Sequence, residues 1–202
     1  MTLQNINQSM GEELLELDQA KREKVFLVAK QLFSHYGYKK TTVDEIADQA
    51  GISKRTMYQV FSSKEQILAE LVMNDALSFR HHCMSEIKIH RNSNEKLQIF
   101  CTQWRDYFIE NPFLGQVLMD DMDLFTPFLD DTINQVEAGM KEMITRLLTE
   151  GMEYGAFRVL ELPETVDCIL VLLRKFTIES MDQRVQKDPS GWISFILNAV
   201  KA

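Results

Sequence analysis

Apolar residues between Thr41 and Phe61 recur every three or four positions, which is the spacing of one face of a helix. In the first set, the apolar positions are Val43, Ile46, Ala47 and Ala50. That set ends before Gly51, a residue type that readily takes the left-handed backbone of a helix end. In the second set, Met57 and Phe61 are four residues apart and share a face. This pattern predicts two short helices joined by a tight turn.

The polar residues of the same stretch predict where these helices begin and which surface they expose. Thr42 and Glu45 have the spacing of a capping box, and Ser53 is placed to cap the second helix. The residues left facing outward on the second helix are Lys54, Arg55, Thr56, Tyr58 and Gln59. A short helix with this basic surface suits the DNA major groove, which indicates a helix-turn-helix. The alternative is an αα-hairpin whose basic residues only solvate a face.

The rest of the chain also has helical periodicity and few turn signals. Eight Gly and four Pro in 202 residues favour long helices, so the predicted fold class is all-α. The ranges predicted are an N-terminal extension over 1–17, a bracing helix over 18–36, a helix from Lys64 to about Ile89, and helices over 95–110, 113–124, 127–151, 163–187 and 189–202.

Charge is distributed unevenly along the chain. The net charge of −8 by itself disfavours binding to phosphates. Between Gln19 and Ser63, however, eight Lys and Arg stand against four Asp and Glu, so this segment carries +4 and the remainder −12. A basic segment in an otherwise acidic chain is the electrostatic footprint of a DNA-binding head.

Composition argues against several other classes of protein. The hydrophobic fraction of 45% and charged fraction of 26% are typical of globular chains, without an apolar run of membrane-spanning length or a secretory signal. Cys83, Cys101 and Cys168 match no zinc or redox spacing, so we expect reduced thiols and a cytoplasmic protein. The sequence contains no catalytic motif, so we expect neither enzyme activity nor a cofactor.

The segment around the predicted helix-turn-helix resembles the tetracycline-repressor (TetR) family of bacterial transcription regulators. The match is gap-free and covers the N-terminal third of the chain, beyond which only the helical layout is similar. The residues that carry it are Tyr36-Gly37-Tyr38, Thr41-Thr42-Val43, Ile46-Ala47, Ala50-Gly51-Ile52-Ser53-Lys54, Tyr58, Phe61 and Ser63-Lys64-Glu65. Arg55 and Gln59-Val60 replace the family's common Gly and His-Tyr, which indicates an idiosyncratic operator.

The resemblance implies a three-helix DNA-binding head over 18–63 and a helical-bundle body for ligand binding and dimerisation over 64–202. It implies a homodimeric repressor that binds a palindromic operator in double-stranded DNA and is released by a small, largely apolar inducer. Two-fold pairing supplies the specificity that a single recognition helix lacks. The alternative is a helix-turn-helix protein controlled by a protein partner or organising the chromosome, without small-molecule induction.

On the predicted DNA face, two kinds of contact can be separated. Base reading is assigned to Lys54, Arg55, Thr56 and Gln59, because Arg and Lys can pair with guanine and Gln with adenine. Phosphate contacts, which position the head without specifying sequence, are assigned to Lys39, Thr42, Tyr58 and Lys64. Lys64 also opens a helix whose free amides can hold a phosphate.

Aromatic and Met side chains of the predicted body are candidates for the wall of an apolar ligand pocket. They are Trp104, Tyr107, Phe108, Met119, Met122, Phe125, Met140, Met143 and Phe176. Residue by residue, such a stripe is more often plain core, and the pocket itself is implied by the resemblance. Acidic residues nearby raise a weaker alternative, a cationic ligand; they are Asp106, Glu110, Asp120, Asp121 and Asp123.

The resemblance implies dimerisation through the last two predicted helices. Apolar surface there is offered by Leu170, Leu173, Phe176, Trp192, Phe195, Ile196 and Ala199. Elsewhere, His82, Glu86 and His90 share one helical face with the spacing of metal ligands, but no fourth ligand accompanies them. A solvated face is therefore the favoured interpretation, and we expect no metal site.

Overall fold

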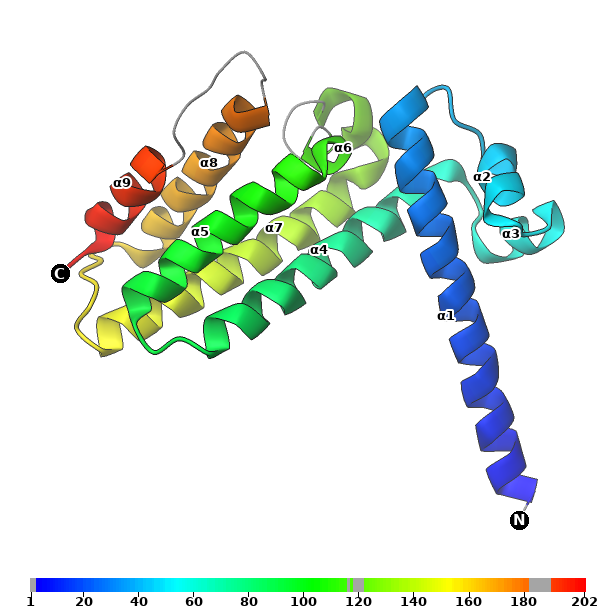
Figure 1. The fold of residues 1–202 in the computed structure, drawn as a ribbon, viewed down its shortest axis with the longest axis horizontal. Coiled ribbons are helices and arrows are strands. Elements are labelled where there is room, and N and C mark those ends of the chain that lie inside the picture. Colours follow the sequence, from blue (N-terminus) through cyan, green and yellow to red (C-terminus); the bar gives the residue numbers. More distant parts are fainter. Residues whose placement is uncertain (1–2, 116, 118–121, 182–189) are drawn as a thin grey trace. The chain divides into compact units, whose positions relative to one another are not determined.

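A computed structural model of the chain describes residues 3–115, 117, 122–181 and 190–202 (Figure 1). Within these ranges the regular elements are helices, and no strand is present. The predicted all-α fold class is therefore confirmed. None of the described helices combines the length and the apolar character of a membrane-spanning segment. The chain divides into two compact units, a head over Met1–Leu71 and a body over Val72–Ala202.

The head is built from α1 (Leu3–Tyr36), α2 (Val43–Ala50), α3 (Lys54–Val60) and the beginning of α4 (Lys64–Lys88). These helices share one small core, because each contributes apolar side chains at helical spacing. Its buried residues include Val25, Phe26, Ala29, Phe33, Ile46, Ala47, Met57, Phe61, Ile67 and Leu68. The rings of Phe26 and Phe61 meet edge to face with centroids 6.0 Å apart. A salt bridge between Arg22 and Glu70 joins α1 to α4.

The body contains the remainder of α4 together with α5 (Ser93–Glu110), α6 (Pro112–Gly115), α7 (Met122–Glu153), α8 (Leu162–Met181) and α9 (Ser190–Val200). Helix α5 is central, since it packs against α6, α7, α8 and α9, and α7 also packs along α8 (Figure 1). The apolar interior of the body includes Leu97, Phe100, Leu114, Leu129, Met143, Ile144, Leu148 and Leu173.

Backbone hydrogen bonds fix the end of the chain to the segment that follows α7. Arg158 N donates to Val200 O at 2.8 Å, and Ala202 N donates to Ala156 O at 3.1 Å. Phe157, between the two, is buried with its ring against Gly151. A Cβ at Gly151 would lie 1.9 Å from that ring, so glycine is needed here for close approach.

Two boundaries between the predicted ranges fall within continuous helices. Helix α1 is continuous from Leu3, so the backbone of the predicted extension continues into the bracing helix. The predicted separation of the 113–124 and 127–151 helices is wrong at this boundary, because α7 runs continuously from Met122 to Glu153. Pro127 is the sixth residue of α7, beyond the first four amides that have no partner within the helix, so it removes one backbone hydrogen bond. The end predicted for the 163–187 helix lies outside the described residues.

Candidate DNA interface and ligand pocket

Helix α2 begins with the predicted capping box. Thr42 Oγ1 accepts a hydrogen bond from Glu45 N at 3.2 Å, while Glu45 Oε2 accepts one from Thr42 N at 2.8 Å. Both amides would otherwise lack a partner at the start of the helix. At the other end, Gly51 has φ 64°, and its amide bonds to carbonyls of the last turn. The polar and glycine signals in the sequence thus fix both ends of α2.

Helix α3 follows after a turn of three residues, Gly51, Ile52 and Ser53. Ile52 N donates to Ala47 O at 2.9 Å, which holds the turn against α2. Ser53 caps α3, because its Oγ accepts a hydrogen bond from Thr56 N at 3.1 Å. Met57 is buried and anchors α3 to the head core. The opposite face of α3 is therefore turned to solvent, in the arrangement of a recognition helix.

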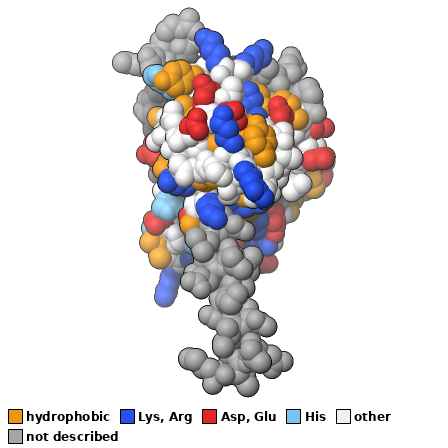
Figure 2. Space-filling view, turned by 90° about the vertical axis from the view of Figure 1, so that its right-hand side faces the viewer, with side chains coloured by type: hydrophobic (Ala, Val, Ile, Leu, Met, Phe, Trp, Pro, Cys, Tyr) orange, Lys and Arg blue, Asp and Glu red, His pale blue; other side chains and the backbone are white. Residues whose placement is uncertain are grey.

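This outward face carries the residues assigned to base reading. Lys54, Arg55 and Gln59 are exposed, and Thr56 is partly buried with its Oγ1 2.8 Å from Ser53 Oγ. Among the described residues, neither Arg55 nor Gln59 has a hydrogen-bond or ion-pair partner. Figure 2 shows the side of the head that bears α2 and α3, where Lys and Arg side chains (blue) lie among a few acidic (red) and hydrophobic (orange) ones.

One acid lies within this basic surface. Asp44, in the first turn of α2, accepts a hydrogen bond from Lys54 Nζ at 2.6 Å through Oδ2. Its Oδ1 lies 3.4 Å from the hydroxyl of Tyr58. The hydrogen bond and charge of Lys54 lower the pKa of Asp44, so its carboxylate is ionised at neutral pH. Two residues assigned to DNA contacts are therefore held by one carboxylate, which the sequence pattern did not reveal.

Lys64 has contacts within the head that the sequence did not reveal either. Its Nζ donates to Tyr38 O at 2.8 Å and to Thr41 O at 2.9 Å, and lies 4.3 Å from the centre of the Tyr38 ring. The Tyr38 hydroxyl donates to Glu65 at 2.9 Å. Lys64 thus stabilises the loop that leads into α2. Its phosphate contact stays a prediction, as do those of Tyr58, Thr42 and the exposed Lys39.

The body contains an apolar pocket between α4, α5, α6, α7 and α8. The non-atom space among its lining residues, open solvent included, is about 530 Å³, of which about 30 Å³ can hold the centre of a water molecule. The lining residues are Val72, Asp75, Ala76, Phe79, Trp104, Tyr107, Phe108, Leu114, Ile133, Val136, Glu137, Met140, Leu170 and Arg174. Four of the nine residues assigned to a pocket from the sequence are among them: Trp104, Tyr107, Phe108 and Met140.

The aromatic residues of this wall are fixed by contacts with one another and by two hydrogen bonds. Ring centroids of Trp104 and Phe108 are 5.1 Å apart, as are those of Phe79 and Tyr107. Trp104 Nε1 donates to Thr177 Oγ1 at 3.0 Å, and the Tyr107 hydroxyl donates to the Asp75 carbonyl at 3.2 Å. Trp104 is therefore a pocket residue and a core residue at once.

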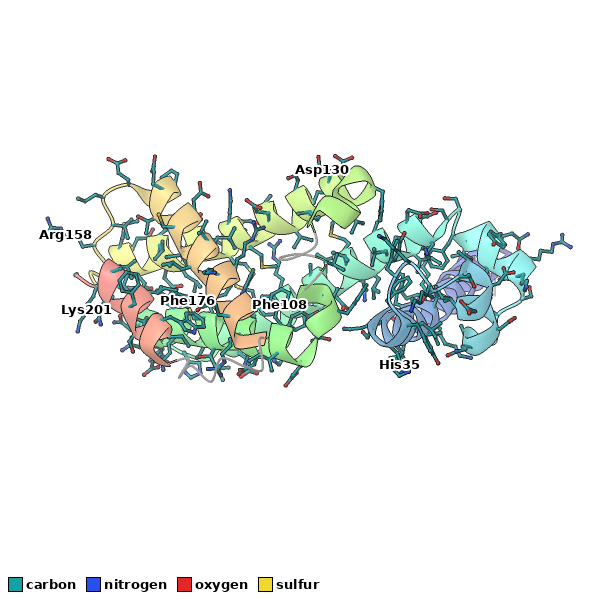
Figure 3. All side chains as sticks on the ribbon, turned by 90° about the horizontal axis from the view of Figure 1, so that it is seen from above. His35, Phe108, Asp130, Arg158, Phe176 and Lys201 are labelled. Carbon is teal, nitrogen blue, oxygen red and sulfur yellow. The ribbon has the colours of Figure 1, made fainter. Side chains whose placement is uncertain are left out.

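The other pocket candidates have different surroundings. Met143 is buried but absent from the lining, and Phe176 stacks on Trp192 of α9 with centroids 5.5 Å apart. Figure 3 shows Phe176 on α8 on the side of α9, away from Phe108 at the far end of α5. Met119 and the side chains of Met122 and Phe125 lie outside the described residues.

A chain of four charged groups runs from the pocket wall to the surface. Arg174 Nη2 donates to Glu137 Oε2 at 2.7 Å, Lys141 Nζ lies 3.0 Å from Glu137 Oε1, and Lys141 Nζ lies 2.9 Å from Asp167 Oδ1. Burial opposes the ionisation of Glu137, but the bonds from Lys141 and Arg174 outweigh it and lower the Glu137 pKa. Nothing in the sequence pattern had indicated this network.

The residues assigned to dimerisation divide by exposure within the single chain. Leu170, Leu173, Trp192 and Ile196 are buried against other helices of the body. Phe195 is 60% exposed and Ala199 is exposed on α9, while Val171 on α8 is 64% exposed. A dimer contact on these two helices would therefore use the exposed side chains, and the roles of the residues assigned to the interface from the sequence stay predictions.

The possible metal ligands and the acids are not grouped around a site. His82 is exposed and His90 pairs with Glu95 at 3.3 Å; the described side chains contain no group of three potential ligands. Asp106 pairs with Arg105, and Glu110 is exposed on α5. Neither acid lines the pocket. Asp120, Asp121 and the side chain of Asp123 lie outside the described residues.

Comparison with known proteins agrees with this architecture. Residues 26–71 match the family of bacterial regulatory proteins, tetR family. The fatty acid metabolism regulator protein of Bacillus subtilis (strain 168) is 26% identical over 157 residues, which span 78% of this chain and 77% of that protein. The structure of the fatty acid degradation regulator FadR from Bacillus halodurans superposes with a TM-score of 0.74 at 23% identity, covering 88% of this chain and 93% of that one.

A second solved structure, FadR from Bacillus subtilis in complex with stearoyl-CoA, has a TM-score of 0.71 at 22% identity, covering 87% of this chain and 95% of that one. The capped helix-turn-helix and these relatives define a DNA-binding transcription regulator and not an enzyme. Residues 26–71 match the TetR family, as the sequence pattern of this segment predicted.

Proposed function

We propose that the protein is a repressor that binds a palindromic operator as a homodimer and leaves it when a small, largely apolar molecule occupies the body pocket. This proposal is carried by Arg55 and Gln59 on the capped α3, whose exposed side chains have no partner within the described part of the chain. Their side chains are available for base edges, with Lys54 and Thr56 beside them. Lys39, Thr42, Tyr58 and Lys64 contact phosphates in the same complex.

The pocket supports the second half of the proposal. Its wall is mostly aromatic and aliphatic, with few polar groups, which suits an apolar ligand held by a small number of directed contacts. The Bacillus subtilis FadR structure contains stearoyl-CoA, a long acyl chain on a polar carrier. We therefore propose an acyl compound as the ligand class.

Helix α4 offers a physical route for ligand control. Lys64 and Glu65, at its start, bond to the loop before α2, and Val72, Asp75 and Phe79 farther along the same helix line the pocket. A ligand controls DNA binding only if it has different affinities for the DNA-competent and DNA-incompetent states. We propose that occupation of the pocket favours a position of α4 in the second state.

Selection of bound fragments from random DNA by the purified protein tests the DNA half. The expected product is a two-fold symmetric sequence, bound by a dimer as determined by light scattering together with mobility shift. Fragments without a shared sequence would instead support a chromosome-organising role.

For the ligand half of the proposal, dodecanoyl-CoA is added to the protein–operator complex, and release of the protein is measured by fluorescence anisotropy of labelled DNA. Unchanged anisotropy at saturating ligand would remove acyl induction from the proposal.

A further inference from the structure

The pocket wall contains one cationic side chain, Arg174 of α8, among the described residues. Its Nη2 donates to Glu137 Oε2 at 2.7 Å, and the side chain is 30% exposed. A guanidinium group has five N–H donors, so this bond leaves most of them available. No second acceptor for Arg174 is found among the described residues.

Glu137 is satisfied in a different way. One of its oxygens accepts from Arg174 and the other lies 3.0 Å from Lys141 Nζ, so two cations share one carboxylate at the pocket edge. Lys141 is in turn balanced by Asp167 at 2.9 Å. Among the residues that the structure describes, Arg174 pairs with no second anion, and it lies beside an apolar wall that solvates a charge poorly.

We propose that Arg174 binds the anionic head group of an amphipathic ligand whose apolar chain occupies the space between α4, α5 and α7. This inference rests on the proposed ligand-binding function and specifies the polar end of the ligand. A carboxylate or a phosphate oxygen matches the planar fork of Arg by paired, charge-assisted hydrogen bonds. A free fatty acid offers the first group, and an acyl thioester of coenzyme A offers the second.

Four ligands with the same chain of twelve carbons separate these possibilities: dodecanoate, dodecanoyl-CoA, dodecanol and dodecylamine, each below its micellar concentration. Binding to the full-length protein is measured by calorimetry, so the readout does not depend on Trp104. The variant is Arg174→Gln. Lys175→Gln is its control, because Lys175 is a neighbouring cation on α8 that is 65% exposed and pairs with Glu179 outside the pocket.

Arg174→Gln is expected to weaken binding of the anionic ligand at least roughly tenfold, which is the size of one charge-assisted hydrogen bond. Dodecanol binding should stay within about twofold, and Lys175→Gln should bind all ligands as the unsubstituted protein does. If Arg174→Gln weakens the binding of dodecanoate, the carboxylate is the group that Arg174 binds. If it weakens only the binding of dodecanoyl-CoA, that group is a phosphate.

Glu137→Gln provides a test with the opposite sign. It keeps a hydrogen-bonding side chain beside Arg174 and removes the competing charge, so it should strengthen binding of the anionic ligand several-fold. A purely structural salt bridge would give weaker binding in both variants, and thermal melting followed by circular dichroism shows whether either variant is unfolded.

An Arg174→Gln protein that melts cooperatively and binds every ligand normally would overturn the inference. Tighter binding of dodecylamine than of both anions to the unsubstituted protein would overturn it as well. Absence of binding by all four ligands would instead contradict the proposed pocket function itself.

Discussion

The head and the body acquire their helices by different means. In the head, short helices end where polar or glycine residues satisfy the backbone, as at Thr42, Gly51 and Ser53. In the body, long helices are held by contacts between distant residues, such as Trp104 with Thr177 and Phe157 with Gly151. A bond between residues three apart is visible in a sequence, whereas a bond between residues 73 apart is not. The comparison explains why the exposed residues of α3 could be predicted one by one from the sequence, whereas most of the pocket wall could not.

If distant packing holds the body together, Trp104→Ala should have the largest effect on the protein. The substitution empties a buried site and leaves Thr177 Oγ1 without its donor. The free energy of unfolding should fall by about 3–5 kcal/mol, measured by urea denaturation followed by circular dichroism. Trp104→Phe keeps most of the apolar volume and should cost clearly less. Equal losses for the two variants would mean that the hydrogen bond, and not packing, dominates here.

Gly151→Ala tests the same idea with a single methyl group. The new Cβ would lie 1.9 Å from the Phe157 ring, which must move away from its buried position. A loss of about 1–3 kcal/mol in the free energy of unfolding is expected from this overpacking. The control is Gly139→Ala, also within α7, whose Cβ would meet only Arg80 at 3.9 Å. That variant should be neutral or slightly stabilised, because alanine favours helix. Destabilisation of both variants alike would assign the effect to α7 itself.

The same contrast sets what the sequence could predict. The ends of α2 and α3 follow from local chemistry, and the exposed residues of α3 follow from the apolar positions of Met57 and Phe61. In the body, periodicity predicts helices but not which buried side chain borders a space. Met140 lines the pocket and Met143, three residues later, does not, although both are buried on α7.

Charged pairs across helices were equally hidden from the sequence. Arg174 and Glu137 are 37 residues apart, and Lys54 and Asp44 are ten residues apart across the turn. The spacing of side chains along one helix does not determine contacts between helices, since these depend on the angle and distance at which the helices cross. The carboxylates that pair with Lys54 and Arg174 could therefore be identified only from the three-dimensional structure.

On the DNA face, comparison of Arg55→Ala with Lys39→Ala separates base reading from phosphate contact. Loss of Arg55 should relax preference at one position of each half-site, by about 1–3 kcal/mol. Loss of Lys39 should weaken binding to all DNA sequences about equally. It should also reduce the slope of the logarithm of the binding constant against that of the salt concentration by about one unit. Lys39 is a better comparator than Lys64, whose ammonium group also bonds to Tyr38 and Thr41 within the head. Binding to a set of single-base operator variants at several salt concentrations measures both effects; uniform loss with Arg55→Ala would remove it from the base readers.

The smallest expected effect concerns Asp44, which restrains Lys54 and approaches Tyr58. At neutral pH this carboxylate is charged, because the bond from Lys54 lowers its pKa, and it reduces the attraction of Lys54 for phosphates. Asp44→Asn should therefore strengthen binding to random DNA several-fold at low salt and steepen the salt dependence by about one unit. Operator binding should gain less, because a base contact by Lys54 depends on its position as well as its charge. The ratio of operator affinity to random-DNA affinity should therefore fall.

Asp48→Asn is the matched control, since it makes the same change of charge on an exposed residue of α2 that has no hydrogen bond from Lys54. An equal gain in both variants would show that Asp44 acts through net charge alone. A larger gain for Asp44→Asn would show that local bonding within the head adjusts its contact with DNA, as the charged network at the pocket is proposed to do for the body.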